Sequence, residues 1–228
     1  KIAWSYFPKQ DPSVQAIMCC DVVNRGLGFG DGKIFLQQND GTLVALDAKT
    51  GAKIWDVVNL DPKVGASNTN APHVIKDKVL TGCSGAEFGV RCFMAAYNLK
   101  DGSLVWKAWS TGSDADALIG EGFNKDTPEY SALSVYQDVN GGNKEGGCFK
   151  RIPTDQLKIG EKDLGIRTWL KPQAVKDGWQ HGGGSIWGWW PYDAKTNLVY
   201  YGTANPSVWN PDVRPGDNKW AMTIFARD

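Results

Sequence analysis

The sequence has no long hydrophobic run, no excess charge of either sign and only two histidines among its 228 residues. No apolar stretch approaches the roughly 18 residues that a membrane helix needs, so no membrane-spanning helix is expected. The 25 basic residues balance 25 acidic ones, which gives no electrostatic reason to expect nucleic acid or an anionic membrane as partner. No charged and apolar leader opens the chain, so we expect any export signal to have been removed.

Cysteine is also scarce, since the five present are too few for a disulfide scaffold and no pair has zinc-ligand spacing. Cys19 and Cys20 are adjacent, and a bridge between them would strain the backbone because consecutive Cα atoms lie only about 3.8 Å apart. Two buried thiols at a strand end are the ordinary alternative. The odd count leaves at least one thiol unpaired. The pairing of Cys83, Cys92 and Cys148 stays open, with Cys92–Cys148 as one possibility.

Two common kinds of enzyme site are excluded. Neither His73 nor His181 lies in a hydrolase motif, which argues against a Ser-His-Asp triad. The glycines at positions 26, 28 and 30 lack the spacing of the dinucleotide fingerprint and precede a strand signal instead of a helix. A nicotinamide site is therefore rejected.

Tryptophan is abundant, with eleven residues, and three of them recur at a fixed interval. Trp4, Trp55 and Trp106 lie 51 residues apart, and residues 45–55 resemble residues 96–106. Each phrase predicts a strand, a turn opened by Asp or Asn and closed by Gly, and a second strand whose tryptophan packs between neighbouring sheets. A period of this length indicates repeated supersecondary units such as propeller blades.

Short β-rich segments fill the interval between the tryptophans and are separated by turn residues. The expected strands are 34–38, 42–46, 53–58, 73–75 and 78–81. Four short strands per repeat are typical of a propeller blade. The apolar residues do not recur at helical spacing, so we predict an all-β fold.

The two ends of the chain carry the two halves of the repeated phrase, at residues 1–4 and 226–228. We therefore expect residues 1–228 to be an internal part of a longer propeller, because three full or partial blades cannot close a ring. The repeated pattern of strands and turns is interrupted over residues 107–180, which we interpret as a long inter-strand excursion from the blades. Long ordered loops are often functional, although a solvated insertion is the simpler interpretation.

Three segments carry residues suited to binding. Residues 182–190 place three glycines beside three tryptophans, which suits stacking on a flat ligand, although a tight turn with core aromatics is the simpler interpretation. Glu87 follows a strand among small residues and could bind a hard cation or cap a turn. Asn205 could offer an amide oxygen to the same ion, or form an ordinary Asn-Pro turn.

Taken together, these motifs resemble the large subunit of the quinoprotein methanol dehydrogenases. The resemblance covers nearly the whole chain except about residues 120–168. It rests on the tryptophan phrase, on the cysteine pair with the residues that follow it (19–26) and on four further segments: 84–91, 182–189, 202–206 and 214–220.

This resemblance implies an eight-bladed β-propeller with tryptophan-docking repeats, with pyrroloquinoline quinone on its axis and a Ca²⁺ or lanthanide ion beside it. Cys19 and Cys20 match the family's adjacent disulfide on one face of the quinone, and Trp187 matches the tryptophan on the other face. Arg25 matches an arginine that assists at the reactive carbonyl. The rim that hydrogen-bonds the quinone is matched by Thr69, Ser84, Gly85, Ala86 and Ser185. Glu87 and Asn205 match two metal ligands.

The resemblance further implies a bacterial periplasmic enzyme that oxidises methanol or another small primary alcohol to the aldehyde and passes electrons to a soluble cytochrome c. A homodimer, with or without a small subunit, is implied as well. Ser185 stands where threonine is common in the family. The catalytic aspartate is expected after Asp228, so no base is assigned within the chain. A cofactor-free propeller used as an assembly or binding scaffold is the alternative, as is a relative acting on larger alcohols or sugars.

Overall fold

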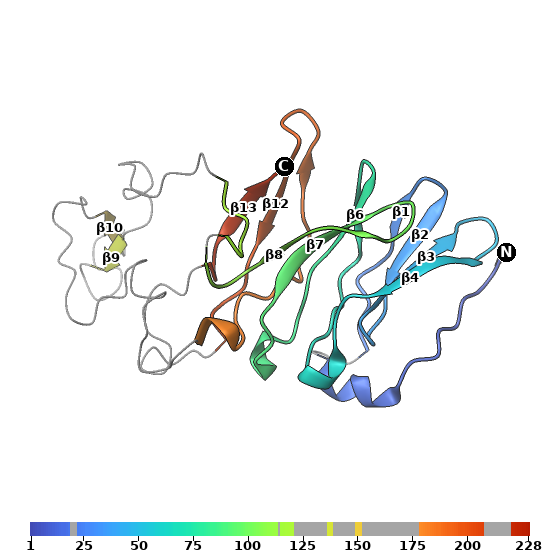
Figure 1. Ribbon diagram of the computed structural model, residues 1–228, viewed down its shortest axis with the longest axis horizontal. Coiled ribbons are helices and arrows are strands. Elements are labelled where there is room, and N and C mark those ends of the chain that lie inside the picture. Colours follow the sequence, from blue (N-terminus) through green and yellow to red (C-terminus); the bar gives the residue numbers. More distant parts are fainter. Residues whose placement is uncertain (19–21, 114, 121–135, 139–148, 152–177, 208–219) are drawn as a thin grey trace.

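The structure is a computed structural model that describes residues 1–18, 22–113, 115–120, 136–138, 149–151, 178–207 and 220–228. The described strands form two four-stranded sheets, a three-stranded sheet and a separate two-stranded pair, and within each sheet consecutive strands pair antiparallel. The three larger sheets lie side by side in sequence order (Figure 1). The prediction of an all-β fold is confirmed.

The first sheet contains β1 (Gly28–Gly30), β2 (Lys33–Gln37), β3 (Thr42–Asp47) and β4 (Lys53–Val58). The second contains β5 (His73–Ile75), β6 (Lys78–Thr81), β7 (Phe93–Asn98) and β8 (Leu104–Trp109). The third contains β11 (Tyr192–Asp193), β12 (Leu198–Gly202) and β13 (Ile224–Arg227). The separate pair is β9 (Tyr136–Asp138) and β10 (Phe149–Arg151). Short 3₁₀ helices connect them: η1 (Pro12–Ile17), η2 (Pro62–Val64), η3 (Ala86–Phe88) and η5 (Gly178–Gln180).

The strands predicted from β-rich segments between turn residues agree with β2 to β6 to within one residue at each end. β1 was not predicted, because its Gly-Phe-Gly sequence has no strand signature. A Cβ at Gly28 would lie 2.6 Å from the carbonyl oxygen of Pro72, and one at Gly30 would lie 2.6 Å from Val74 Cγ1. The glycines therefore let β1 approach the second sheet closely, and β1 and β5 are in contact.

The second sheet is buried on both faces, as expected for a blade between two neighbours. Side chains alternate along each strand, so Phe93, Ala95 and Tyr97 of β7 pack toward the first sheet. Met94 and Ala96 of the same strand pack toward the third sheet. Two hydrophobic cores result, one on each side of β7, and each joins residues of neighbouring sheets.

The repeated tryptophans link one unit to the next. Trp4 Nε1 donates a hydrogen bond to the carbonyl oxygen of Ala48 at 3.0 Å, and Trp55 Nε1 donates to that of Leu99 at 3.3 Å. Each indole also covers the turn glycine of the repeated phrase: a Cβ at Gly51 or Gly102 would lie 2.5 or 2.7 Å from Cε3 of the tryptophan. Both glycines have a positive φ, of 74° and 75°. Each position therefore excludes a side chain for two independent reasons.

The predicted excursion over residues 107–180 lies mostly outside the described residues. β8 continues to Trp109, so the first residues of this range belong to the second sheet. β9, β10 and η5 also lie within it. None of the helices in the part of the chain that the structure describes has the length and apolarity needed to cross a lipid bilayer.

Gly102→Ala should destabilise the protein more than Gly32→Ala. Both glycines have positive φ, but a Cβ at Gly32 would meet nothing within 4 Å, whereas one at Gly102 would strike the Trp55 ring. We expect Gly32→Ala to lower the free energy of unfolding by about 1 kcal/mol from backbone strain. Gly102→Ala should add a further ~1–3 kcal/mol from overpacking. Urea denaturation of the two variants measures the difference, and equal midpoints would contradict the role assigned to the Trp55 contact.

Candidate functional site

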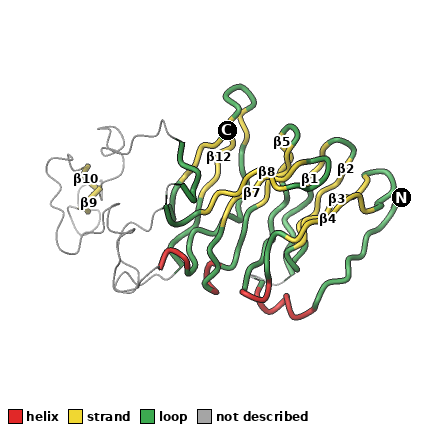
Figure 2. Tube along the Cα trace, in the orientation of Figure 1, coloured by secondary structure: helices red, strands yellow, loops and turns green. Residues whose placement is uncertain are grey.

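The segments singled out in the sequence meet at one edge of the row of sheets. Residues 82–89 follow β6, residues 182–187 precede β11, and residues 203–207 follow β12. The short 3₁₀ helices lie along this same edge (Figure 2). The candidate site is therefore assembled from connections of different sheets.

Backbone hydrogen bonds join the three segments. Cys83 and Ile186 exchange two bonds, of 3.0 and 2.8 Å. Gly184 N donates to the carbonyl oxygen of Asn205 and Ala204 N donates to that of Ser185, both at 2.9 Å. These bonds fix the three backbone segments relative to one another, so their side chains are held at fixed relative positions.

The predicted metal ligands, Glu87 and Asn205, are joined through their neighbours in sequence. Ser207 Oγ donates a 2.6 Å hydrogen bond to the carbonyl oxygen of Ala86, the residue before Glu87. Ser207 N donates to Asn205 Oδ1 at 2.9 Å. Ser207 thus connects the two segments, and it does so with a φ of 79°, which is unusual for a residue other than glycine.

Gly182 brings a third segment against the same carbonyl group. A Cβ at this position would lie 2.3 Å from the Ala86 oxygen, so only glycine fits. Its φ is 86°, in the region that favours glycine. Gly182 therefore lets residues 182–190 approach the Glu87 loop closely, while the stacking of a flat ligand on this segment stays a prediction. Trp190 is a core residue with 2% exposure, as the simpler interpretation expected, whereas Trp187 and Trp189 are exposed.

Arg25, Thr69 and Trp187 form a second group at the site. The Arg25 side chain donates from Nη1 to Thr69 Oγ1, and Arg25 N donates to the Thr69 carbonyl oxygen at 3.0 Å. The guanidinium carbon lies 5.2 Å from the centre of the Trp187 ring, and this ring is 47% exposed. Among the described residues, Arg25 has no carboxylate partner. The group therefore offers a cation and an open aromatic face.

A buried amide network holds the backbone next to Thr69. Asn68 Nδ2 donates to Thr81 Oγ1 and to the Gly82 carbonyl oxygen, at 2.8 and 2.7 Å. Asn70 Nδ2 donates to the carbonyl oxygen of Ile186 at 3.0 Å, while its Oδ1 is buried without a hydrogen-bond partner. Asn68 and Asn70 are at most 1% exposed. Together they tie the Thr69 segment to both the second sheet and residue 186.

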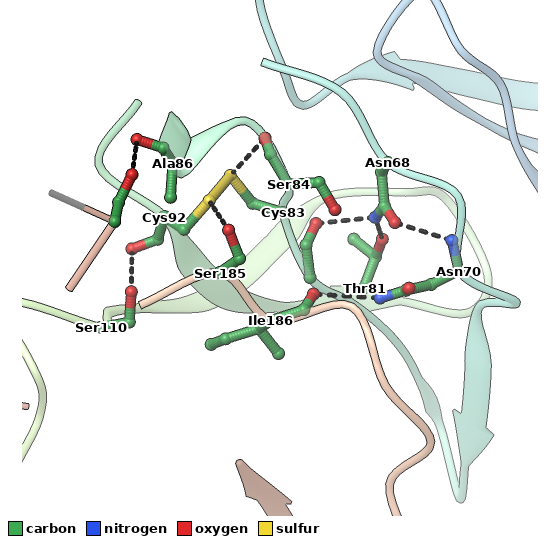
Figure 3. The surroundings of a disulfide bond; sticks show 12 residues. Asn68, Asn70, Thr81, Cys83, Ser84, Ala86, Cys92, Ser110, Ser185 and Ile186 are labelled. Carbon is green, nitrogen blue, oxygen red and sulfur yellow. Dashed lines mark hydrogen bonds between the residues drawn. A yellow bond between two sulfur atoms is a disulfide. The ribbon is translucent and has the colours of Figure 1, made fainter. Parts of the chain in front are cut away.

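Cys83 and Cys92 form a disulfide bond, with Cα atoms 5.3 Å apart (Figure 3). The possible pairing of Cys92 with Cys148 is therefore wrong, because Cys92 is bonded to Cys83. Both bonded residues are fully buried. The Ser185 hydroxyl lies 3.9 Å from Cys92 Sγ. Cys19, Cys20 and Cys148 lie outside the described residues, so the predicted bridge between Cys19 and Cys20 stays a prediction.

Arg91 anchors the far end of the loop that carries Glu87. Its guanidinium lies between the rings of Trp109 and Trp179, at 4.5 and 4.4 Å from their centres. It also donates to the Thr111 carbonyl oxygen at 2.6 Å and to Asp116 Oδ2 at 2.9 Å. This hydrogen bond from Arg91 holds the pKa of Asp116 below its ordinary value, against the opposing effect of burial.

The donor set fits both groups that the resemblance implies. A ligand with several carboxylates is well bound by a cation together with hydroxyl groups. The cation here is Arg25, and the hydroxyls belong to Thr69, Ser84 and Ser185. A carboxylate with an amide oxygen suits a hard metal ion, and Glu87 and Asn205 supply these. Within the described ranges, no group of three or more His, Cys, Asp or Glu could hold a metal. The two predicted ligands would thus form part of a coordination shell.

Sequence inspection missed two residues that build the site. Ser207 is an ordinary polar residue in a loop, and nothing in its neighbourhood signals that its hydroxyl meets Ala86. Asn70 follows Thr69 directly, and a run of small polar residues at 67–70 was the only available signal. Both act through long-range contacts, which a local pattern does not encode.

Comparison with known proteins agrees with the resemblance seen in the motifs. Residues 21–222 match the model of a family described as outer membrane protein assembly factor BamB. The chain is 46% identical over 233 residues to methanol dehydrogenase (cytochrome c) subunit 1 of Methylorubrum extorquens. It is 47% identical over 228 residues to a lanthanide-dependent methanol dehydrogenase of the same organism. Each match covers 100% of this chain and 32% of the relative, so the chain spans about a third of their length.

Among solved structures, the chain is similar to a europium-containing methanol dehydrogenase, with a TM-score of 0.78 and 42% identity. That match covers 100% of this chain and 34% of the other. The predicted resemblance to methanol dehydrogenases is confirmed, and the sheets are part of a β-propeller. The number of blades in the whole ring stays a prediction.

Asp116→Asn should reduce stability at neutral pH but not in acid. Arg91 lowers the folded-state pKa of Asp116, so the contribution of its carboxylate is fully present above the ordinary value of 3.8 and is lost progressively as the pH falls from there through the lowered pKa. Because the side chain is 38% exposed, we expect only about 0.2–1 kcal/mol at pH 7. Urea unfolding of both proteins at pH 7 and near pH 3 measures this, and a difference that persists unchanged in acid would contradict it.

Proposed function

Because the chain belongs to the family described as outer membrane protein assembly factor BamB, and because its homologues of nearly half-identical sequence are methanol dehydrogenases, we propose that it is part of a quinone- and metal-dependent alcohol dehydrogenase. The proposed reaction is oxidation of methanol or another small primary alcohol to the aldehyde. Electrons would leave to a cytochrome c. The observation that carries the proposal is the meeting of Arg25, Thr69 and Trp187 with the segments of Glu87 and Asn205 at one edge of the sheets.

The residues of this chain would bind and orient the cofactor. Trp187 offers an exposed face on which a planar ring can stack, and Arg25 beside it carries a positive charge without a carboxylate partner among the described residues. Thr69, Ser84 and Ser185 offer hydroxyls, while Gly85 and Ala86 offer backbone groups. Cys19 and Cys20 are proposed to cover the opposite face of the ring.

Glu87 and Asn205 would supply oxygen ligands to Ca²⁺ or a lanthanide ion. Within the described residues, the Glu87 carboxylate has no hydrogen-bond or ion-pair partner, and it is exposed at the site. Asn205 Oδ1 accepts one bond from Ser207 N, and its second lone pair can face a cation. When bound, the quinone would accept hydride from the alcohol, and the metal would stabilise the negative charge that develops on the carbonyl oxygen. The Arg25 guanidinium would assist that stabilisation.

The proposed compartment is the bacterial periplasm, because the buried Cys83–Cys92 disulfide fits an oxidising environment. A homodimer and a small subunit are further proposals that rest on the relatives alone, one of which is named as subunit 1. The catalytic base is proposed to lie in sequence that follows Asp228.

A cofactor-free assembly scaffold is the second candidate function, and the description of the matching family favours it. One experiment distinguishes the two candidate functions. The intact protein that carries this chain is supplied with pyrroloquinoline quinone and Ca²⁺ or a lanthanide, and is then freed of unbound cofactor. A dehydrogenase retains quinone that absorbs in the near ultraviolet and shows dye-linked oxidation of methanol. A protein that shows neither would support the scaffold.

Glu87→Gln should abolish metal retention while leaving the protein folded. The substitution keeps the size of an exposed side chain and removes its charge, so metal content and alcohol oxidation should each fall by at least about 100-fold, beyond the effect of a residue that only supports a ligand. Elemental analysis of the purified protein measures the metal. Asp56→Asn, which removes an exposed carboxylate elsewhere, is the matched control and should retain metal. Wild-type metal content in Glu87→Gln would contradict the assignment.

Thr69→Val should weaken quinone binding, whereas Thr69→Ser should not. Valine has the shape of threonine but lacks the hydroxyl that accepts the Arg25 hydrogen bond, so the guanidinium loses a partner that orients it. A hydrogen bond to a charged group contributes about 1.5–3 kcal/mol, which corresponds to roughly 10-fold or more in affinity. Titration of the metal-loaded apoprotein with quinone measures this. Equal affinities of the valine and serine variants would contradict the role of the hydroxyl.

A further inference from the structure

The loop that carries Glu87 is closed by the Cys83–Cys92 disulfide. The two cysteines are nine residues apart, and both are fully buried. Four of the predicted site residues lie between them: Ser84, Gly85, Ala86 and Glu87. The Cys83–Cys92 bond is the covalent link around this part of the site, and none of the binding roles proposed above involves it.

The exposed middle of the loop, residues 87–89, has little support of its own. Its only helical element, η3, is three residues long and has no side-chain cap at its start. Within the loop, backbone bonds run only from residues 88, 89 and 90 to the carbonyl groups of residues 85 and 86. Glu87 and Phe88 are exposed, and Phe88 is 57% exposed. An exposed stretch of this kind opens easily unless the residues on either side of it are constrained.

The bonded sulfurs lie against the other segments of the site. The Ser185 hydroxyl is 3.9 Å from Cys92 Sγ, and Cys83 pairs with Ile186 through two backbone hydrogen bonds. Ser84 pairs with Ser67 in the same way, at 2.8 and 3.1 Å. Figure 3 shows the sulfurs lying among Ser84, Ala86 and Ser185. The disulfide therefore fixes the loop at the point where it meets residues 185 and 186.

We propose that the Cys83–Cys92 disulfide is a positioning element of the metal site, which holds the Glu87 loop in place against the segments of Ser185 and Asn205. This inference rests on the proposed function. A cross-link of nine residues restricts the open conformations of the loop. Without it, Glu87 samples positions away from the metal, so the metal leaves faster even though the sheets stay folded.

The test uses the intact protein loaded with quinone and metal. In Cys83→Ala/Cys92→Ala, release of metal into excess chelator should be roughly 10- to 100-fold faster than in the wild type, as for other residues that support a ligand. Amide hydrogen exchange should accelerate in residues 84–91 and stay unchanged in residues 104–109 of β8. Cys83→Val/Cys92→Ala restores apolar volume but not the covalent bond, and it should release metal as fast as the double-alanine variant. This comparison separates the loss of the bond from the loss of packing.

Gly102→Ala is the control for a general loss of stability, because it acts at a turn of the second sheet that no predicted site residue contacts. It should release metal at the wild-type rate. Release from the cysteine variants at the wild-type rate, or acceleration of the same size in Gly102→Ala, would overturn the proposal for the disulfide. A wild-type protein that retains neither metal nor quinone would instead overturn the proposed function, and this inference with it.

Discussion

The site depends on the burial of β7 on both faces. Phe93, Ala95 and Tyr97 pack against the first sheet, while Met94 and Ala96 pack against the third. Since side chains of a strand alternate, this strand is fixed from both directions, and the two alanines leave little room for it to shift. The loop that precedes β7 consequently starts and ends at fixed points between two neighbours. Segments that precede and follow the strands of the third sheet can therefore contact this loop without an additional helix or strand to position them.

Much of the fold could be predicted from local signals. The turn residues and β-rich segments located β2 to β6 closely, and the 51-residue interval of the tryptophans indicated repeated blades. β1 was missed because its glycines carry no strand preference. They are needed only because a neighbouring sheet approaches, and that neighbour is contributed by residues 72–74.

The candidate site could be predicted in part, through motifs long enough to resemble a known family. The resemblance indicated Arg25, Thr69, Trp187, Glu87 and Asn205, and the structure brings their segments to one edge. The Ser207 hydrogen bond and the Cys83–Cys92 pairing were not predicted. A spacing of nine residues permits a disulfide without requiring one, since the loop geometry between the cysteines decides whether their Cα atoms come within bonding range.

The repeated blade alone does not distinguish a dehydrogenase from a scaffold, because one fold supports many functions. The distinction lies in what the edge of the sheets exposes. Ala86, Ser185 and Ser207 are at most 6% exposed, so the backbone beneath the site is rigidly packed. Above it stand an exposed carboxylate, an indole with an open face and a guanidinium without a carboxylate partner among the described residues. Rigid backbone beneath exposed functional groups is the arrangement that binding sites require, because groups already in position lose little entropy when a ligand arrives.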